Sequence, residues 1–118
     1  MKSALKGLRW LAAGALVLDC EARRAMLKGR PLALTPRGLA VLEYLMRHSG
    51  EIIGRERLLE AVWGASPRAA GPRAVDVRIA EVRRALRDDP SRPRYIQTVA
   101  GEGYAFVAEV WGEGKDEL

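Results

Sequence analysis

Cysteine and histidine are nearly absent from this sequence, which contains one of each among its 118 residues. One cysteine forms no intrachain disulfide and no cysteine-based zinc site, and one histidine forms no histidine-rich metal site. Apolar runs are also short, whereas a membrane-spanning helix needs about 20 consecutive apolar residues. These absences argue against a disulfide scaffold, a metal centre or other cofactor site, and an integral membrane protein.

The composition is otherwise that of a globular protein with an excess of positive charge. Hydrophobic residues make up 48% of the chain and charged residues 30%, as in ordinary folded domains. The 20 lysines and arginines outnumber the 15 aspartates and glutamates, which gives a net charge of +5 and a pI near 9.9. A pI above about 9 is typical of domains that bind nucleic acids. The length suits one domain with a single core.

An apolar N-terminal stretch resembles an export signal, with Cys20 in the place of a lipoprotein cysteine. Arg9 and Gly14 interrupt the stretch, and Asp19 stands where such a signal needs a small neutral residue. We therefore interpret residues 8–34 as short strands separated by turns, because each apolar piece is too short for a helix. The prediction for these residues is an antiparallel sheet of three or four strands. Because the stretch does not fit an export signal, we expect a cytoplasmic protein.

Three helices are predicted after this sheet. Thr35 can cap the free N–H groups of a helix that begins at Pro36 and stops before Gly50. A second helix is predicted over residues 55–63 and a third over residues 73–88, because apolar residues recur there at helical spacing. A loop rich in glycine, proline and alanine separates the two.

The third helix combines an apolar stripe with an arginine-rich outer face. Four apolar residues are spaced by four, three and four positions, so they share one side of the helix, which must face the core. They are Val75, Ile79, Val82 and Leu86. The residues on the opposite side are Arg73, Val77, Ala80 and Arg84. Such a face fits either an ordinary solvated helix or a helix that enters the major groove of DNA.

A β-hairpin is predicted after the third helix. Two runs rich in aromatic and β-branched residues, residues 95–99 and 104–107, flank a turn that contains two glycines. Helix, helix, basic helix and hairpin in this order predict a winged helix-turn-helix of the α+β class, with an N-terminal antiparallel β-sheet, three helices and a C-terminal β-hairpin wing. We expect this domain to span residues 8–111, between tails at residues 1–7 and 112–118, the second of them a frayed end.

Motifs along the whole chain match one family in order and spacing. In the first half the matching residues are Leu34, Thr35, Pro36, Arg55, Glu56, Leu58, Leu59, Val62, Trp63 and Gly64. In the second half they are Arg73, Ala74, Val75, Asp76, Val77, Ile79, Arg83, Leu86, Ile96, Gln97, Thr98, Val99, Gly101, Gly103, Tyr104 and Phe106. From about residue 8 to residue 107 the chain resembles the DNA-binding effector domain of OmpR/PhoB-type bacterial response regulators. The resemblance implies sequence-specific binding of double-stranded DNA and transcription regulation in a two-component system.

The resemblance also implies roles for particular residues. On the third helix, the positions that match base or phosphate contacts are Arg73, Val77, Arg78 and Arg83. Arg55 and Trp63 match positions that hold the phosphate backbone, and Thr98 matches a wing residue that meets the sugar–phosphate chain. The loop at residues 64–72 matches the segment that contacts RNA polymerase in activators of this family.

Several positions depart from the pattern of the family. Gly38 stands where the family often has a glutamate that closes a capping box with Thr35. Ala100 stands where an arginine often reaches the minor groove, and Glu102 lies nearby. Fewer arginines and more carboxylates lower the electrostatic part of DNA affinity.

Ala80 and Glu81 stand where basic residues often point into the groove. Ala80 and Val77 can contact thymine methyl groups, and Glu81 can accept a hydrogen bond from a cytosine amino group. Equally, Glu81 can form only a surface pair with a nearby arginine, Arg78 or Arg84, or no pair. The candidate DNA-binding residues are therefore Arg55, Trp63, Arg73, Val77, Arg78, Ala80, Glu81, Arg83, Arg84 and Thr98.

Two functions fit these features. The retained arginines favour a DNA-binding transcription regulator, whereas the changes at Ala80, Glu81 and Ala100 favour an interaction module that docks on RNA polymerase or another regulator with weakened DNA binding. The sequence shows no catalytic constellation, which argues against an enzyme. It also shows no receiver domain, so we expect control by abundance, a partner or another site. We expect a monomer in solution that can bind DNA in tandem.

Overall fold

Four N-terminal strands and one strand near the C-terminus form a five-stranded antiparallel sheet. The structure is a computed structural model that describes residues 8–64 and 70–113. The strand order is β4-β3-β2-β1-β7. The strands are β1 (Trp10–Ala13), β2 (Leu16–Asp19), β3 (Arg24–Leu27), β4 (Arg30–Pro31) and β7 (Trp111–Glu113). The prediction of a small antiparallel sheet over residues 8–34 is confirmed.

Strand β7 corrects the expectation of a frayed end at residues 112–118. Gly112 pairs with Leu11 and Glu113 pairs with Trp10, so the ordered structure extends beyond Trp111. The physical reason is that β1 would otherwise be an edge strand with unpaired N–H and C=O groups. The expected tail at residues 1–7 and the rest of the C-terminal tail, residues 114–118, lie outside the described residues.

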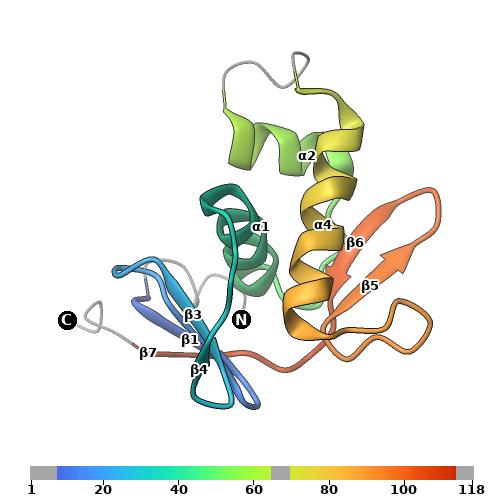
Figure 1. Cartoon of the computed structure of the whole chain (residues 1–118). Coiled ribbons are helices and arrows are strands. Elements are labelled where there is room, and N and C mark those ends of the chain that lie inside the picture. Colours follow the sequence, from blue (N-terminus) through green and yellow to red (C-terminus); the bar gives the residue numbers. More distant parts are fainter. Residues whose placement is uncertain (1–7, 65–69, 114–118) are drawn as a thin grey trace.

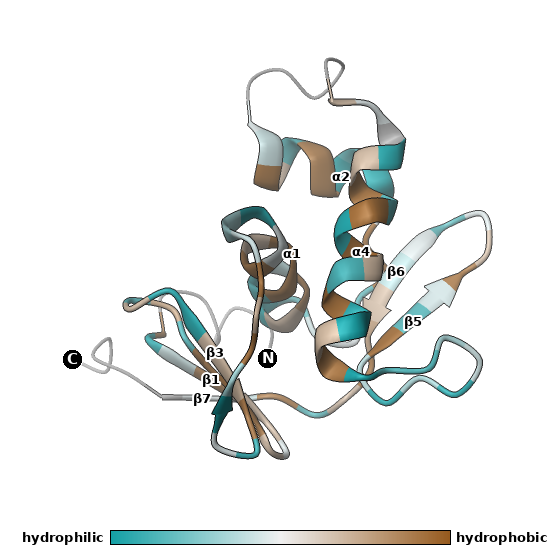
Figure 2. Ribbon diagram, in the orientation of Figure 1, coloured by the Kyte–Doolittle hydropathy of each residue, from teal (hydrophilic) through white to brown (hydrophobic). Residues whose placement is uncertain are grey.

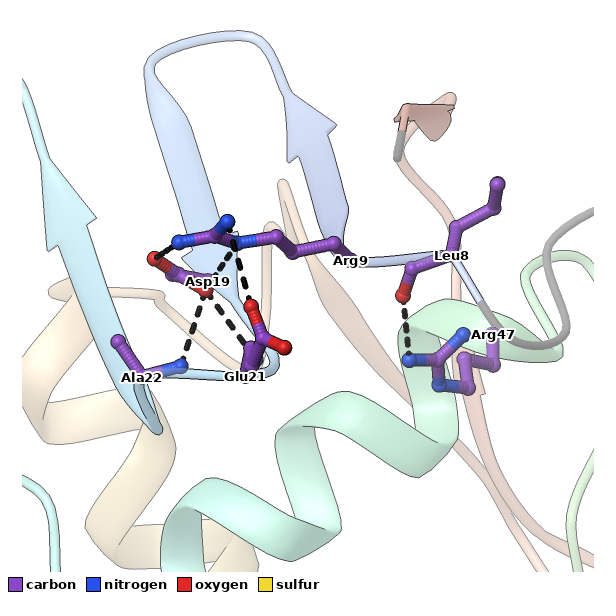
Figure 3. Close-up of polar contacts among 6 residues, drawn as sticks. All are labelled: Leu8, Arg9, Asp19, Glu21, Ala22 and Arg47. Carbon is purple, nitrogen blue, oxygen red and sulfur yellow. Dashed lines mark hydrogen bonds and ion pairs between the residues drawn. The ribbon is translucent and has the colours of Figure 1, made fainter. Parts of the chain in front are cut away.

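Asp19 organises the turn that follows β2 (Figure 3). Its carboxylate accepts hydrogen bonds from the backbone N–H groups of Ala22 at 3.0 Å and Glu21 at 3.1 Å, and from the Arg9 guanidinium at 3.4 Å. The bond from Ala22, with the contribution of Arg9, holds the pKa of Asp19 below its usual value despite burial. Arg47 of the first helix donates to the carbonyl of Leu8 at 2.9 Å, which attaches the start of the sheet to the helices (Figure 3).

The helices lie between this sheet and the C-terminal hairpin (Figure 1). They are α1 (Pro36–Arg47), α2 (Arg55–Leu58), the π-helical segment η2 (Leu59–Trp63) and α4 (Pro72–Leu86). The second helix, expected to be uniform over residues 55–63, therefore changes its winding at Leu59. The third ends at Leu86, two residues earlier than expected, because Arg87 adopts a left-handed backbone conformation with φ 55°.

The predicted apolar stripe of α4 is confirmed. Val75, Ile79, Val82 and Leu86 are all buried, and α4 packs against α1. In Figure 2 apolar and polar residues alternate along α4, as expected for a helix with one buried side. Val77, on the opposite side, is 52% exposed. The rotation of α4 about its axis is therefore the one that the sequence predicts.

The hairpin of β5 (Ile96–Val99) and β6 (Gly103–Phe106) forms a separate two-stranded sheet beside α4 (Figure 1). Ile53 exchanges two backbone hydrogen bonds with Tyr104, at 2.7 and 3.0 Å, so the extended link before α2 adds to this sheet. Gly103 permits the contact, since its φ is +141° and a Cβ there would overlap the carbonyl of Ile53. The predicted wing is confirmed and is attached directly to the helix-turn-helix.

Candidate nucleic-acid interface

The outer side of α4 carries four of the candidate DNA-binding residues. Arg73, Val77, Ala80 and Arg84 are all exposed. Because they recur every three to four residues on a straight helix, they form one continuous strip of surface. The side chain of Arg84 forms no ion pair or hydrogen bond with any residue that the structure describes. Two positive charges and two apolar side chains are therefore presented together.

Three residues of this strip, Val77, Ala80 and Arg84, line one side of an open concavity of about 670 Å³. The other side is the segment that leads from the sheet into α1. Its lining residues are Ala33, Leu34, Thr35, Val77, Arg78, Ala80, Glu81 and Arg84. The concavity brings the start of α1 next to the base-reading side of α4, a proximity that the sequence motifs do not predict.

Glu81 is engaged by two residues of this concavity. Its carboxylate accepts the backbone N–H of Thr35 at 2.6 Å and lies 2.8 Å from the Thr35 hydroxyl. Arg78 Nη1 donates to the same carboxylate at 2.7 Å and to Thr35 Oγ1 at 3.1 Å. Of the alternatives for Glu81, the structure therefore contains the surface pair with Arg78, together with a contact to Thr35 that sequence reasoning missed.

Arg83 connects α4 to the wing. One of its terminal nitrogens donates to the carbonyl of Ile96 and to the hydroxyl of Thr98, both at 2.8 Å. The guanidinium also lies 5.8 Å from the centroid of the Tyr104 ring. Its Nε atom is buried without a hydrogen-bond partner. The structure thus brings together two candidate residues, Arg83 and Thr98, that were expected to contact DNA separately.

Arg55 belongs to a second polar cluster, which joins α2, α4 and β6. Its Nε donates to the carboxylate of Asp76 at 2.8 Å, and the hydroxyl of Tyr104 donates to the same oxygen at 2.6 Å. Burial opposes ionisation of Asp76, but the hydrogen bonds from Tyr104 and Arg55 outweigh it, so the pKa of Asp76 lies below its usual value. Burial and the neighbouring carboxylate raise the pKa of Tyr104.

Asp76 and Tyr104 were not among the candidate residues. The signal that could have identified Asp76 is a lone carboxylate in the first part of a basic helix, where a cation on another element can pair with it. The cluster fixes the two helices of the helix-turn-helix and the wing relative to one another. The guanidinium groups of Arg55 and Arg83 both lie against the ring of Tyr104.

The remaining candidates lie at the borders of this surface. Trp63 is half-buried at the end of η2, with the guanidinium of Arg37 4.9 Å from its ring centroid. Ala100 and Glu102 are exposed at the tip of the wing. Most of the loop expected to contact RNA polymerase, residues 65–69, lies outside the described residues.

In the described part of the chain, every helix is too short or too polar to span a bilayer. Residues 8–64 and 70–113 contain no cluster of three or more histidine, cysteine, aspartate or glutamate side chains that could bind a metal ion.

The fold and this surface define a winged helix-turn-helix protein. The family model described as "Transcriptional regulatory protein, C terminal" matches residues 29–106. The chain belongs to this family, the DNA-binding domains of OmpR/PhoB-type transcription regulators. The resemblance inferred from the motifs is confirmed.

Individual relatives agree with this assignment. Protein PetR of Rhodobacter capsulatus is 38% identical over 107 residues, which cover 87% of this chain and 45% of PetR. The DNA-binding domain of Klebsiella pneumoniae RstA, solved in complex with the RstA box, is 33% identical with a TM-score of 0.75 and aligns over 84% of this chain and 97% of that domain. DrrB of Thermotoga maritima, an OmpR/PhoB homologue, is 36% identical with a TM-score of 0.75, over 84% of this chain and 44% of DrrB. The chain spans less than half the length of PetR and DrrB.

Proposed function

We propose that this chain binds double-stranded DNA with sequence specificity and regulates transcription. The observation that carries the proposal is the exposed strip of Arg73, Val77, Ala80 and Arg84 on α4, with the wing held beside it by Arg83. A helix of this kind fits the major groove, where arginines bind guanine edges and apolar side chains contact thymine methyl groups. The RstA domain, similar over nearly its whole length, was solved with the RstA box bound, which supports the same role here.

The other candidates are proposed to contact the phosphate backbone. Arg55, Arg83 and Thr98 lie on the side of the strip that faces the wing, where both arginines contact the ring of Tyr104. Arg78 lies on the side that faces the start of α1, and Trp63 ends η2. Arg55 and Arg83 already donate to protein acceptors, so we expect their remaining N–H groups to face phosphates. Contacts of this kind fix the register of a protein on DNA without reading sequence.

The wider setting of the protein follows from the same proposal. We propose that residues 8–111 with strand β7 act as the DNA-binding unit in the bacterial cytoplasm, without enzymatic activity. Residues 64–72 are the proposed contact with RNA polymerase. The unit is proposed to be monomeric in solution and to bind in tandem on DNA.

A docking module with little DNA affinity is the competing function. Its support from the sequence was the changes at Ala80, Glu81 and Ala100, of which Glu81 adds a carboxylate to α4. That carboxylate is directed to Thr35 and paired with Arg78, so it repels phosphates less than an unpaired one. The structure therefore weakens the argument for the alternative.

Selection from a pool of random duplexes tests the proposed function. The wild-type chain is expected to enrich one duplex sequence, and Arg84→Ala to bind that duplex more weakly. Arg24→Ala is a matched control, because Arg24 is equally exposed but lies on β3, away from α4. Failure to enrich any sequence, or equal weakening by both substitutions, would contradict the proposal.

A further inference from the structure

The first turn of α1 is capped by residues from two distant parts of the chain. Thr35 Oγ1 accepts the N–H of Gly38 at 3.0 Å, which is the first half of a capping box. The second half requires a carboxylate or amide at residue 38 that accepts the N–H of Thr35, and a glycine has none. Glu81 of α4 accepts that N–H instead, at 2.6 Å. The box is therefore completed by a tertiary contact.

Gly38 provides the space for this contact. A Cβ atom at residue 38 would lie 2.5 Å from Oε2 and 2.7 Å from Cδ of Glu81. A side chain at residue 38 and the carboxylate of residue 81 thus exclude one another in their present positions. Two departures from the family pattern, the glycine in α1 and the carboxylate in α4, are explained by one contact.

The hydrogen bonds of this cluster engage both oxygens of Glu81. The hydroxyl of Thr35 accepts from Gly38 and Arg78 and has one proton to donate to Glu81. Both oxygens of Glu81 accept a charged or backbone donor, one from Arg78 at 2.7 Å and the other from Thr35 at 2.6 Å. A cytosine amino group would have to approach a carboxylate that already accepts three hydrogen bonds, from the backbone N–H and hydroxyl of Thr35 and from Arg78. The side chain of Glu81 is also only 17% exposed.

We propose that Glu81 is a positioning residue for DNA recognition and not a reader of bases. It completes the cap of α1, holds Arg78 against Thr35, and leaves base reading to Val77, Ala80 and Arg84. The inference rests on the proposed DNA binding. It adds that the carboxylate of Glu81 couples the start of α1 to the recognition helix. The same carboxylate neutralises the positive charge of Arg78 near the groove.

The cap is tested by a double-mutant cycle in melting temperature, which needs no DNA. Gly38→Ala alone is expected to lower the melting temperature, because the added methyl displaces Glu81. In the Glu81→Ala background the same Gly38→Ala change is expected to raise the melting temperature, because alanine is a better helix former than glycine. The reversal of sign is the diagnostic result. An effect of the same sign in both backgrounds would overturn the proposed cap. Glu81→Ser, whose side chain is also too short to reach residue 38, is the second background should Glu81→Ala not fold.

The role in recognition is tested with the folded Gly38→Ala/Glu81→Ala double variant. It is expected to select the same duplex sequence as wild type. At low salt it should bind that duplex about three- to tenfold more tightly, with a log–log salt slope steeper by about one, because Arg78 becomes available to a phosphate. Loss of preference at a C·G position, or an unchanged salt slope, would overturn the inference.

Failure of the proposed function has a different signature. A wild-type chain that enriches no duplex contradicts DNA binding itself, whereas a wild-type chain that enriches a duplex through Glu81 contradicts only the inference. The sign of the stability cycle is independent of both DNA results. The three measurements together therefore separate the cap, the recognition role and the proposed function.

Discussion

Arg83 of α4 and Thr98 of the wing are joined by a hydrogen bond of 2.8 Å from Nη2 to Oγ1. The same nitrogen donates to the carbonyl of Ile96 at 2.8 Å. A flexible two-stranded hairpin is marginally stable alone, so a guanidinium that bonds to it twice restricts its position. The angle between recognition helix and wing is set by this contact and by the cluster of Arg55, Asp76 and Tyr104.

Arg83→Ala is expected to lower the free energy of unfolding by about 1–3 kcal/mol, because it removes hydrogen bonds to Ile96 and Thr98 made by a charged donor. Urea denaturation measures the change. Arg84→Ala is the matched control, since Arg84 is the next residue on the same helix and is exposed. If both variants unfold at the same urea concentration, Arg83 does not hold the wing.

Ile79→Ala is expected to cost about 2–5 kcal/mol of stability, because it leaves a cavity in the core between α4 and α1. Val77→Ala serves as its control: Val77 is 52% exposed, so its truncation should cost under about 1 kcal/mol. Thermal or urea unfolding measures the loss of stability in both variants. A larger loss for Val77→Ala than for Ile79→Ala would mean that α4 is rotated relative to the structure.

Asp76→Asn is expected to flatten the loss of stability in acid. The pKa of Asp76 is lowered from its usual 3.8 in the folded protein, so its ionised form stabilises the fold above that value. This contribution disappears as the pH falls below 3.8 toward the lower folded pKa. The free energies of unfolding of wild type and Asp76→Asn, measured between about pH 5 and pH 2, give the size of this contribution. Parallel profiles for the two proteins would show that the contacts of Asp76 with Arg55 and Tyr104 do not bias its ionisation.

The periodic elements of this fold could be predicted from sequence, and the contacts between distant elements could not. The stripe of Val75, Ile79 and Val82 repeats at helical spacing, which depends on local sequence alone. Strand β7 has no comparable signal, because Trp111–Glu113 is three residues long and is ordered by pairing with β1. The change of winding at Leu59 is likewise absent from the local pattern.

The candidate site shows the same division. The exposed strip on α4 follows from the helical wheel and is present. The contact of Glu81 with Thr35 joins residues 46 positions apart. The only feature of the sequence that pointed to it was the glycine at residue 38. Arg83 and Thr98 were each expected to face DNA, and their contact with one another depends on how the wing packs beside α4.

Ala100→Arg is expected to tighten binding to most duplexes by about 1 kcal/mol and to steepen the salt slope by about one. Ala100 is exposed at the tip of the wing, beside the exposed Glu102, so an added guanidinium there can reach phosphates. Titration of both proteins on one duplex at two salt concentrations measures the gain. No gain would mean that the wing tip does not approach DNA.

The central claim, that α4 binds DNA through its arginines with the wing beside it, is tested most directly by the salt dependence of affinity for the selected duplex. About four to six phosphate contacts predict a log–log slope of roughly −4 to −5. Arg84→Ala, which removes a base-reading side chain, should weaken binding to the selected duplex, and Arg24→Ala should leave the affinity unchanged. An affinity that does not vary with salt, or an equal change in both variants, would contradict the account.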